Sequence, residues 1–328
     1  MPQVTLDSEI GQRHSKSRGS IGFAIGVPLT VILLLVVGTT TSPEFLTVRN
    51  LLNVLTSISI VGIVAVGMSF VMISGGWADL SVPAVVATGA ILALGMQSTF
   101  GTIGAILIAL VACATAGLIN GLIVGFIKVN PIVVTLGTNI IVLGAAQAFV
   151  GGDIVYNNDP IANAIVAGRV FGIPFIALVF LVVLLFAHIV LAHTVWGRWT
   201  IAAGGNYAAA AASGVPVKLV RCLAFVGTAL AAGLSGCLLA LSLQSARPVI
   251  GAGYEFDAIT ALVVGGVSLL GGAGSIPRVL GGLLIVQLIK NIMVLQGFPT
   301  TSQGLAEGLV IVFAVALDIK LRKRSGDL

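Results

Sequence analysis

Long apolar runs separated by short polar segments dominate this chain of 328 residues. A bilayer core of about 30 Å requires about 20 apolar residues in a helix, and this length predicts ten membrane-spanning helices. They comprise residues 21–39, 51–74, 83–98, 102–126, 132–150, 170–192, 218–243, 254–270, 277–296 and 304–319. The third run is short, which favours a broken or re-entrant element there. The pattern therefore predicts an all-α, polytopic membrane protein.

Two connections between the predicted helices are longer than a simple turn. The first, residues 151–169, contains the turn-forming residues 157–160. The second, residues 194–217, holds an alanine run at residues 208–212 between glycine-rich flanks. Alanine favours helix and glycine interrupts it, so this connection is expected to contain a short helix.

Composition agrees with a lipid environment. The chain is 58% hydrophobic and 8% charged, whereas a soluble domain carries about 25% charged residues. Most of its 42 glycines lie inside apolar stretches, where small residues allow close packing of membrane helices.

Basic residues set the expected orientation. Residues 1–20 and 320–328 form basic tails around a transmembrane domain, residues 21–319, and the positive-inside rule places both tails in the cytoplasm. Two cytoplasmic ends require an even number of spans. Five basic residues between spans or near their ends fall on the same predicted side: Lys128, Arg198, Lys218, Arg221 and Arg278. We expect the protein in a bacterial plasma membrane. The basic residues do not form the clustered face that would indicate nucleic-acid binding.

The sequence contains no recognisable catalytic, ATP-binding or metal-binding motif. Residues 271–275 are glycine-rich, but Ile276 and Pro277 follow instead of the lysine that a P-loop requires. His188 and His193 belong to no HExxH pattern, and no GxSxG or CxxC motif occurs. The three cysteines lie in apolar stretches, as expected for packing residues. We therefore expect no catalytic residue, metal site or cofactor, and any ATPase is a separate polypeptide.

Charged residues near or within spans are candidates for function, because they are costly in lipid. Asp79 lies among the chain-breaking residues 74–83, which indicates either unwound backbone along a water-filled path or an aqueous loop in which Asp79 caps the third helix. Glu255 and Asp257 begin the eighth span. They are expected either to meet a solute or docking partner at the outer mouth or to stabilise a helix N-terminus.

Further charges fall within the last two spans. Lys290 lies in the ninth and Glu307 in the tenth, and a pair between them facing the bundle interior is one interpretation. A proton-coupled carrier would use such buried acids as relays, but few acids are available.

Several segments occur in an order typical of one transporter family. They are residues 67–68, 73–76, 79–82, 120–122, 134–138, 197–198, 204–206, 213–215, 253–259, 265–269 and 271–272. From residue 46 to residue 318 the chain resembles the permeases of ATP-binding-cassette importers for ribose, xylose, arabinose and galactosides. It departs from the family pattern at Trp77 and Ala78, at Pro83 and at Tyr207.

The resemblance implies the importer permease fold of about ten helices and a second permease copy, in a homodimer or in a heterodimer of similar permeases. It also implies a cytoplasmic ATPase that uses Mg-ATP and couples through residues 194–217, and an extracytoplasmic sugar-binding protein. Desolvated sugar hydroxyls need hydrogen-bond partners. The candidates for the substrate path are Asp79, Ser81, Thr135, Thr138 and Asn139. The candidates for the ATPase coupling loop are Arg198, Gly204, Gly205, Asn206, Ala208, Ala209, Ser213 and Gly214.

The expected function is thus the permease subunit of an ATP-driven importer for a pentose, hexose or related polyol. The alternatives are an ion-coupled secondary carrier, a permease for another small solute such as a branched-chain amino acid, and a membrane anchor for an assembly. Residues 79–81 and 254–257 favour the sugar group over the amino-acid group.

Overall fold

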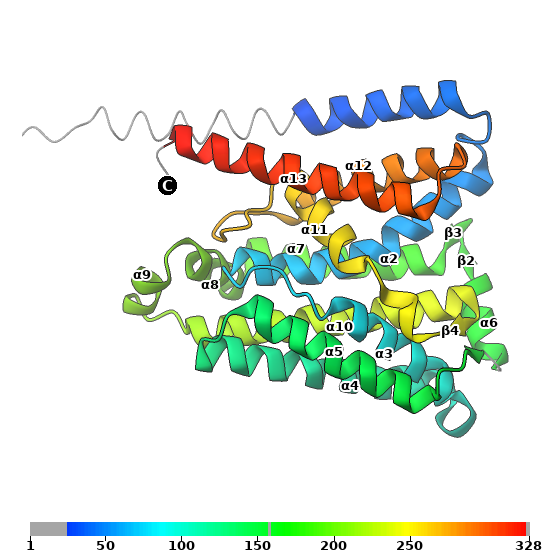
Figure 1. Cartoon of the computed structure of the whole chain (residues 1–328), viewed down its shortest axis with the longest axis horizontal. Coiled ribbons are helices and arrows are strands. Elements are labelled where there is room, and N and C mark those ends of the chain that lie inside the picture. The colour runs from blue at the N-terminus through cyan, green and yellow to red at the C-terminus, as the bar shows by residue number, and fades with distance from the viewer. Residues whose placement is uncertain (1–24, 157–158, 326–328) are drawn as a thin grey trace, which may run out of the picture.

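The computed structural model describes residues 25–156 and 159–325 as a bundle of helices that run roughly parallel to its long axis (Figure 1). Six of the described helices are long and apolar enough to cross a membrane. They are α2 (Val48–Ile73), α4 (Gln97–Leu122) with the π-helix η1 (Ile123–Ile127), α5 (Pro131–Val150), α7 (Phe175–His193), α10 (Val217–Leu243) and α12 (Ile276–Leu295). The bundle has an α8–α9 end and an α6 end, at opposite sides of Figure 1.

The other four predicted spans also coincide with helices, but a count of ten crossings is not confirmed. A helix at Ile25–Thr41 and α3 (Val82–Gly95) are apolar but shorter. Helix α11 (Tyr254–Val264) has 11 residues, and α13 (Thr300–Ser325) is long but carries charged residues. The predicted tail 1–20 lies outside the described residues. The predicted tail 320–328 belongs to α13 as far as Ser325.

Helices α3 and α11 are too short to cross a bilayer core alone. At a rise of 1.5 Å per residue, 14 and 11 residues span about 21 and about 16 Å, against a core of about 30 Å. Irregular backbone precedes α3, with left-handed φ values of 74° at Gly75 and 58° at Trp77. The short third segment that the sequence predicts is therefore confirmed.

The eighth predicted span, residues 254–270, is corrected by the structure, since α11 ends at Val264. Gly265 and Gly266 stop the helix: Gly266 has a φ of 74°, and the Val267 N–H donates back to the Leu262 carbonyl at 2.9 Å. A left-handed glycine with such a back-bond is a common helix terminator.

The starts of the two short helices adjoin inside the bundle. The chain enters α11 through the 3₁₀ turn η2 (Pro248–Gly251). A Cβ added at Gly251 would lie 2.1 Å from the Pro83 carbonyl oxygen, so the end of η2 touches the first turn of α3. Both short helices thus begin within the protein, away from its two ends.

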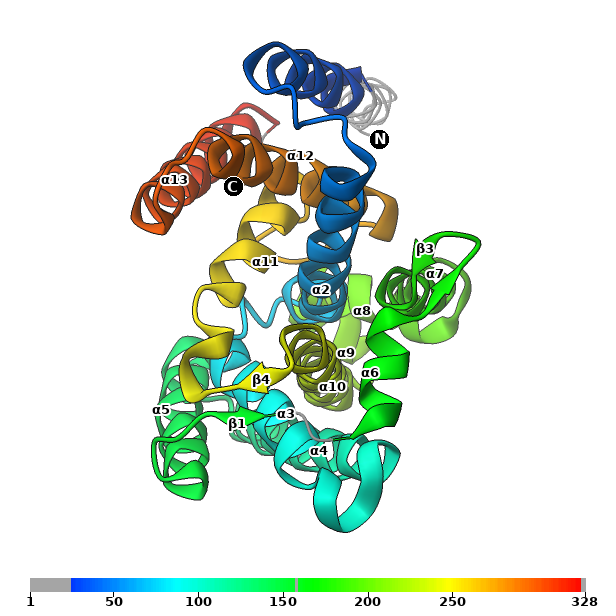
Figure 2. The same cartoon turned by 90° about the vertical axis from the view of Figure 1, so that its right-hand side faces the viewer.

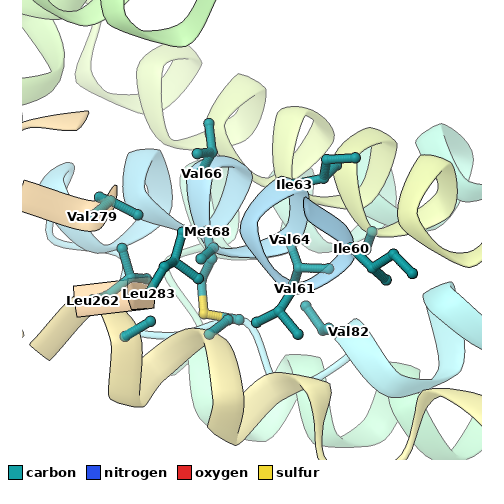
Figure 3. Close-up of a cluster of buried hydrophobic side chains, with 14 of the residues drawn as sticks. Ile60, Val61, Ile63, Val64, Val66, Met68, Val82, Leu262, Val279 and Leu283 are labelled. Atoms are coloured by element: carbon teal, nitrogen blue, oxygen red, sulfur yellow. The ribbon is translucent and has the colours of Figure 1, made fainter. Parts of the chain in front are cut away.

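Helix α10 is the centre of the packing, lying against α2, α3 and α4 (Figure 2). Glycines allow this approach: a Cβ at Gly236 would lie 2.1 Å from the Val86 carbonyl oxygen, and one at Gly89 would lie 2.4 Å from the Gly233 carbonyl oxygen. The main apolar cluster joins α2 to α11 and α12, with side chains such as Val64, Leu262 and Leu283 (Figure 3).

The longer connections contain short ordered elements. At the α6 end, α6 (Pro160–Ala167) occupies the first predicted loop. Strand β1 (Val155–Tyr156) pairs antiparallel with β4 (Ser245–Ala246), and β2 (Arg169–Val170) with β3 (Ile173–Pro174). At the other end, residues 194–217 hold two helices, α8 (Val195–Gly205) and α9 (Tyr207–Ala212), where the alanine run predicts one.

Candidate functional site

A buried polar network begins at Asp79, in the irregular segment before α3. The Asp79 side chain is 1% exposed, so it lies inside protein and not in an aqueous loop. Its Oδ1 accepts a hydrogen bond from the Ser81 backbone N–H at 2.9 Å and another from the Ser81 hydroxyl at 2.5 Å. These bonds fold the segment into the start of α3, because they hold two successive polar residues together.

The network continues through α4 to α5. The Asn120 Nδ2 donates to the Ser81 Oγ at 3.0 Å, and the Thr138 hydroxyl donates to the Asn120 Oδ1 at 2.5 Å. Each donor points toward Asp79, whose carboxylate is the final acceptor. The network therefore ties three elements into one unit at the point where α3 begins.

Asn139 supports the same helix start. Its Oδ1 accepts a hydrogen bond from the Ala84 backbone N–H at 3.1 Å. The first N–H groups of a helix lack partners within the helix, and Pro83 at the second position of α3 contributes none. A side chain of α5 thus caps α3 from outside.

Four of the five predicted path residues are therefore brought together at the start of α3. The fifth, Thr135, is buried on α5, and its hydroxyl donates to the Ile132 carbonyl at 3.4 Å. The network bonds all lie within the chain, and Asp79 and Ser81 are each 1% exposed. A role on a substrate path stays a prediction.

Replacing Asn120 with leucine is expected to destabilise the protein by about 1–3 kcal/mol, because Thr138 loses its acceptor and Ser81 loses a donor inside the core. Thr115→Val is the matched control on α4, since the Thr115 hydroxyl is exposed and bonds only its own helix. Thermal unfolding in detergent measures both variants. Equal shifts in Tm would contradict the assignment.

A second polar cluster joins α11, α12 and α13. The Lys290 ammonium group contacts the Asp257 carboxylate and lies 3.3 Å from Glu307 Oε2. The Thr260 hydroxyl lies 3.4 Å from the other Glu307 oxygen. The interpretation of Lys290 and Glu307 as an interior pair is confirmed, and Asp257 completes it as a third member.

The two acids predicted at the outer mouth begin α11 inside the bundle. Asp257 is 9% exposed, and its carboxylate contacts Lys290 of α12. Glu255 is half-buried, and among the described residues its Oε2 has no hydrogen-bond partner. A docking role for these two acids stays a prediction.

Helices α8 and α9 lie within the predicted coupling loop, residues 194–217. The Thr194 hydroxyl accepts from the Gly197 N–H at 3.3 Å at the start of α8, and Asn206 Oδ1 accepts from the Ala209 N–H at 2.9 Å at the start of α9. Side-chain caps of this kind define helix starts. The exposed coupling candidates are Arg198, Gly205, Asn206, Ala208, Ala209, Ser213 and Gly214.

Five glycines bring the loop against two other turns. We call Gly75, Gly204, Gly205, Gly271 and Gly272 the glycine junction. A Cβ at Gly204 would lie 1.8 Å from the Ile73 carbonyl oxygen, and one at Gly271 would lie 2.8 Å from the Gly75 Cα. The Gly272 N–H donates to the Ile73 carbonyl at 2.8 Å. The end of α8 thus touches the end of α2 and the turn before α12.

Tyr207 fastens the start of α9. The Arg221 guanidinium lies 5.2 Å and the Lys128 ammonium 5.5 Å from the centre of its ring, within range of cation–π attraction. The Arg221 Nε also donates to the Ser74 carbonyl at 3.2 Å. Arg221 therefore links α9 to the segment that leads to Asp79.

The sequence prediction omitted Asn120 and Arg221 from the site. Asn120 had a signal, because an amide inside a membrane helix is costly unless it is bonded. The contact of Gly204 with Gly75, Gly271 and Gly272 was not predicted either.

Comparison with known proteins gives a consistent result. A family model described as "Branched-chain amino acid transport system / permease component" matches residues 50–315. The ribose import permease protein RbsC of Escherichia coli (strain K12) is 34% identical over 297 residues, covering 89% of this chain and 92% of that protein. RbsC of Bacillus subtilis (strain 168) is 35% identical, covering 90% and 92%.

A third relative is named for a different sugar. The L-arabinose ABC transporter permease protein AraH of Azospirillum brasilense is 32% identical over 322 residues, covering 97% of this chain and 95% of that protein. No solved structure matches the chain.

Proposed function

The chain belongs to the permease family of ATP-binding-cassette sugar importers, and on this premise we propose that it forms the path by which such an importer moves a pentose, hexose or related polyol. The observation that carries the proposal is similarity to ribose and L-arabinose permeases over 89% or more of the chain. The names of these relatives favour a pentose.

In this proposal the energy comes from a separate ATPase that binds Mg-ATP in the cytoplasm. Residues 271–275 have no P-loop lysine, and Gly271 and Gly272 belong to the glycine junction. The ATPase docks on the exposed surface of α8 and α9. When the ATPase closes, it pushes these helices, and the push reaches α2 and the turn before α12 through the glycine junction.

The same proposal places the α8–α9 end in the cytoplasm, together with both termini. The C-terminal end of α13 lies at that end of the bundle (Figure 1). An extracytoplasmic sugar-binding protein delivers its cargo at the α6 end. A second permease copy completes the path. Most residues of α5 are exposed or half-buried in the single chain, which leaves surface for the copy and for lipid.

Reconstitution into liposomes tests the function. With the partner ATPase, the binding protein and ATP present, labelled D-ribose or L-arabinose is expected to accumulate, and omitting any one of the three is expected to abolish accumulation. Uptake by the permease alone under an ion gradient would identify a secondary carrier instead. ATP-driven uptake of L-leucine without sugar uptake would assign the chain to amino-acid transport.

A further inference from the structure

A cavity of about 440 Å³ lies between α2, α10, α11 and α12, separate from the Asp79 network. This volume falls within the range of about 300–1,000 Å³ that is typical of small-molecule sites. Polar side chains from all four helices line it. They are Asn53, Thr56, Ser57, Ser242, Tyr254, Asp257 and Gln287.

Most of these polar groups lack protein partners. Gln287 is 6% exposed, and its Nε2 has no hydrogen bond to any described residue. The half-buried Ser242 and Tyr254, and the exposed Asn53 and Ser57 at the rim, likewise make no side-chain hydrogen bond within residues 25–156 and 159–325. The Asp79 network, by contrast, satisfies its own members. The cavity therefore offers hydrogen-bonding capacity that the chain itself does not use.

The cavity lies in the half of the bundle toward the α6 end. Asn53 is five residues from the start of α2, or about 7.5 Å along it, and Ser242 is the penultimate residue of α10. A second cavity of about 360 Å³, lined by Arg247 and Ser245 of the loops at that end, shares Tyr254 with it. The two cavities form a route from the α6 end into the protein.

The polar lining of the cavity indicates what occupies it, because the protein lies in a bilayer. An unpaired polar group facing hydrocarbon is costly, so polar side chains at membrane depth indicate water or a polar solute. A sugar matches the donors and acceptors present, because each hydroxyl both donates and accepts. Amides and hydroxyls can serve either function, the Asp257 carboxylate accepts, and the Tyr254 ring presents an apolar face to C–H groups.

We propose that this cavity binds one monosaccharide within each permease copy, as an entry site that the sugar occupies before it crosses the membrane. The proposal rests on the proposed function, since it takes the cargo class from it. It assigns specificity to the buried Gln287, which the sequence did not single out, and places Asn53 and Ser57 at the rim, where a reporter thiol leaves the interior of the site unchanged.

Cysteine labelling tests the site. The natural cysteines Cys113, Cys222 and Cys237 are buried, so an introduced thiol can be followed alone. Asn53→Cys and Ser57→Cys are expected to react with a charged, membrane-impermeant methanethiosulfonate in proteoliposomes. Leu51→Cys is the matched control: Leu51 is 44% exposed but does not line the cavity, so sugar is expected not to change the labelling of its thiol.

Protection of the introduced thiols from labelling measures sugar binding. D-ribose or L-arabinose at ten times its Kd leaves about one site in eleven free and slows labelling about tenfold. L-leucine is expected to give no protection. Gln287→Leu, combined with Ser57→Cys, is expected to keep the labelling and to weaken the protection by either sugar.

The outcomes separate this proposal from the function. Suppose that the reconstituted importer takes up sugar, but the thiols of the Asn53→Cys and Ser57→Cys variants are unlabelled, or are labelled without protection by any transported sugar. The entry site is then wrong and the function stands. If no sugar is taken up and only L-leucine protects, the proposed function fails and the cavity belongs to another solute.

Discussion

Replacing Gly204 with alanine is expected to destabilise the protein by about 3 kcal/mol or more and to abolish ATP-driven uptake. The added Cβ would lie 1.8 Å from the Ile73 carbonyl oxygen and 2.5 Å from the Gly272 nitrogen. These are the two backbone atoms of one hydrogen bond. Relief therefore requires the end of α8 to move away from both segments, which removes the contact through which the loop is proposed to act.

Gly205→Ala is the matched control one residue later. Its Cβ would lie 4.0 Å from the Gly272 Cα, an ordinary contact, and it remains at the end of the same helix. We expect near-normal stability and uptake. Thermal unfolding in detergent and uptake in liposomes measure both variants. If Gly204→Ala behaves like Gly205→Ala, the glycine junction is not a close-packed contact.

Replacing Lys290 with methionine is expected to cost about 3–5 kcal/mol, because two carboxylates lose the cation that they share. Asp257 and Glu307 are 12% and 10% exposed in their side chains, so water compensates little. The change loosens α13 from α11 and α12. A large fall in Tm in detergent, with loss of α13 protection in hydrogen exchange, is the expected result.

A neutral triple variant separates charge from packing. Lys290→Met combined with Asp257→Asn and Glu307→Gln removes every unpaired charge and is expected to recover most of the lost stability. If the single variant is as stable as the unchanged protein, the cluster is not buried in the way described. If the triple variant is no better than the single one, lost packing of the lysine stem explains the effect.

Much of the fold follows from the apolar pattern, because membrane helices need long apolar runs. The break at Asp79 and the ordered loop at residues 194–217 were also predictable, since glycine, proline and alanine act locally. The length of α11 was not predicted. Gly265 and Gly266 end it, but they lie in an apolar run that continues to residue 270, so the stop signal was hidden.

The site was harder to predict because it depends on which helices become neighbours. Asp79 and Ser81 are two residues apart, but Asn120 is 39 residues beyond Ser81 and reaches it only through the packing of α4 on α3. The position of Asp257 likewise depended on where α11 begins. Its preference for a helix N-terminus was visible in the sequence, but its lysine partner on α12 was not.

The cap that Asn139 places on α3 has a consequence for the order in which the protein is made. While the chain is being synthesised, α3 emerges before α5, so its first N–H groups have no partner at membrane depth. A nascent chain that ends before Asn139 therefore carries an incomplete α3, which is also too short to hold itself across the bilayer. We therefore expect α3 to take its final position only after α5 has been translated.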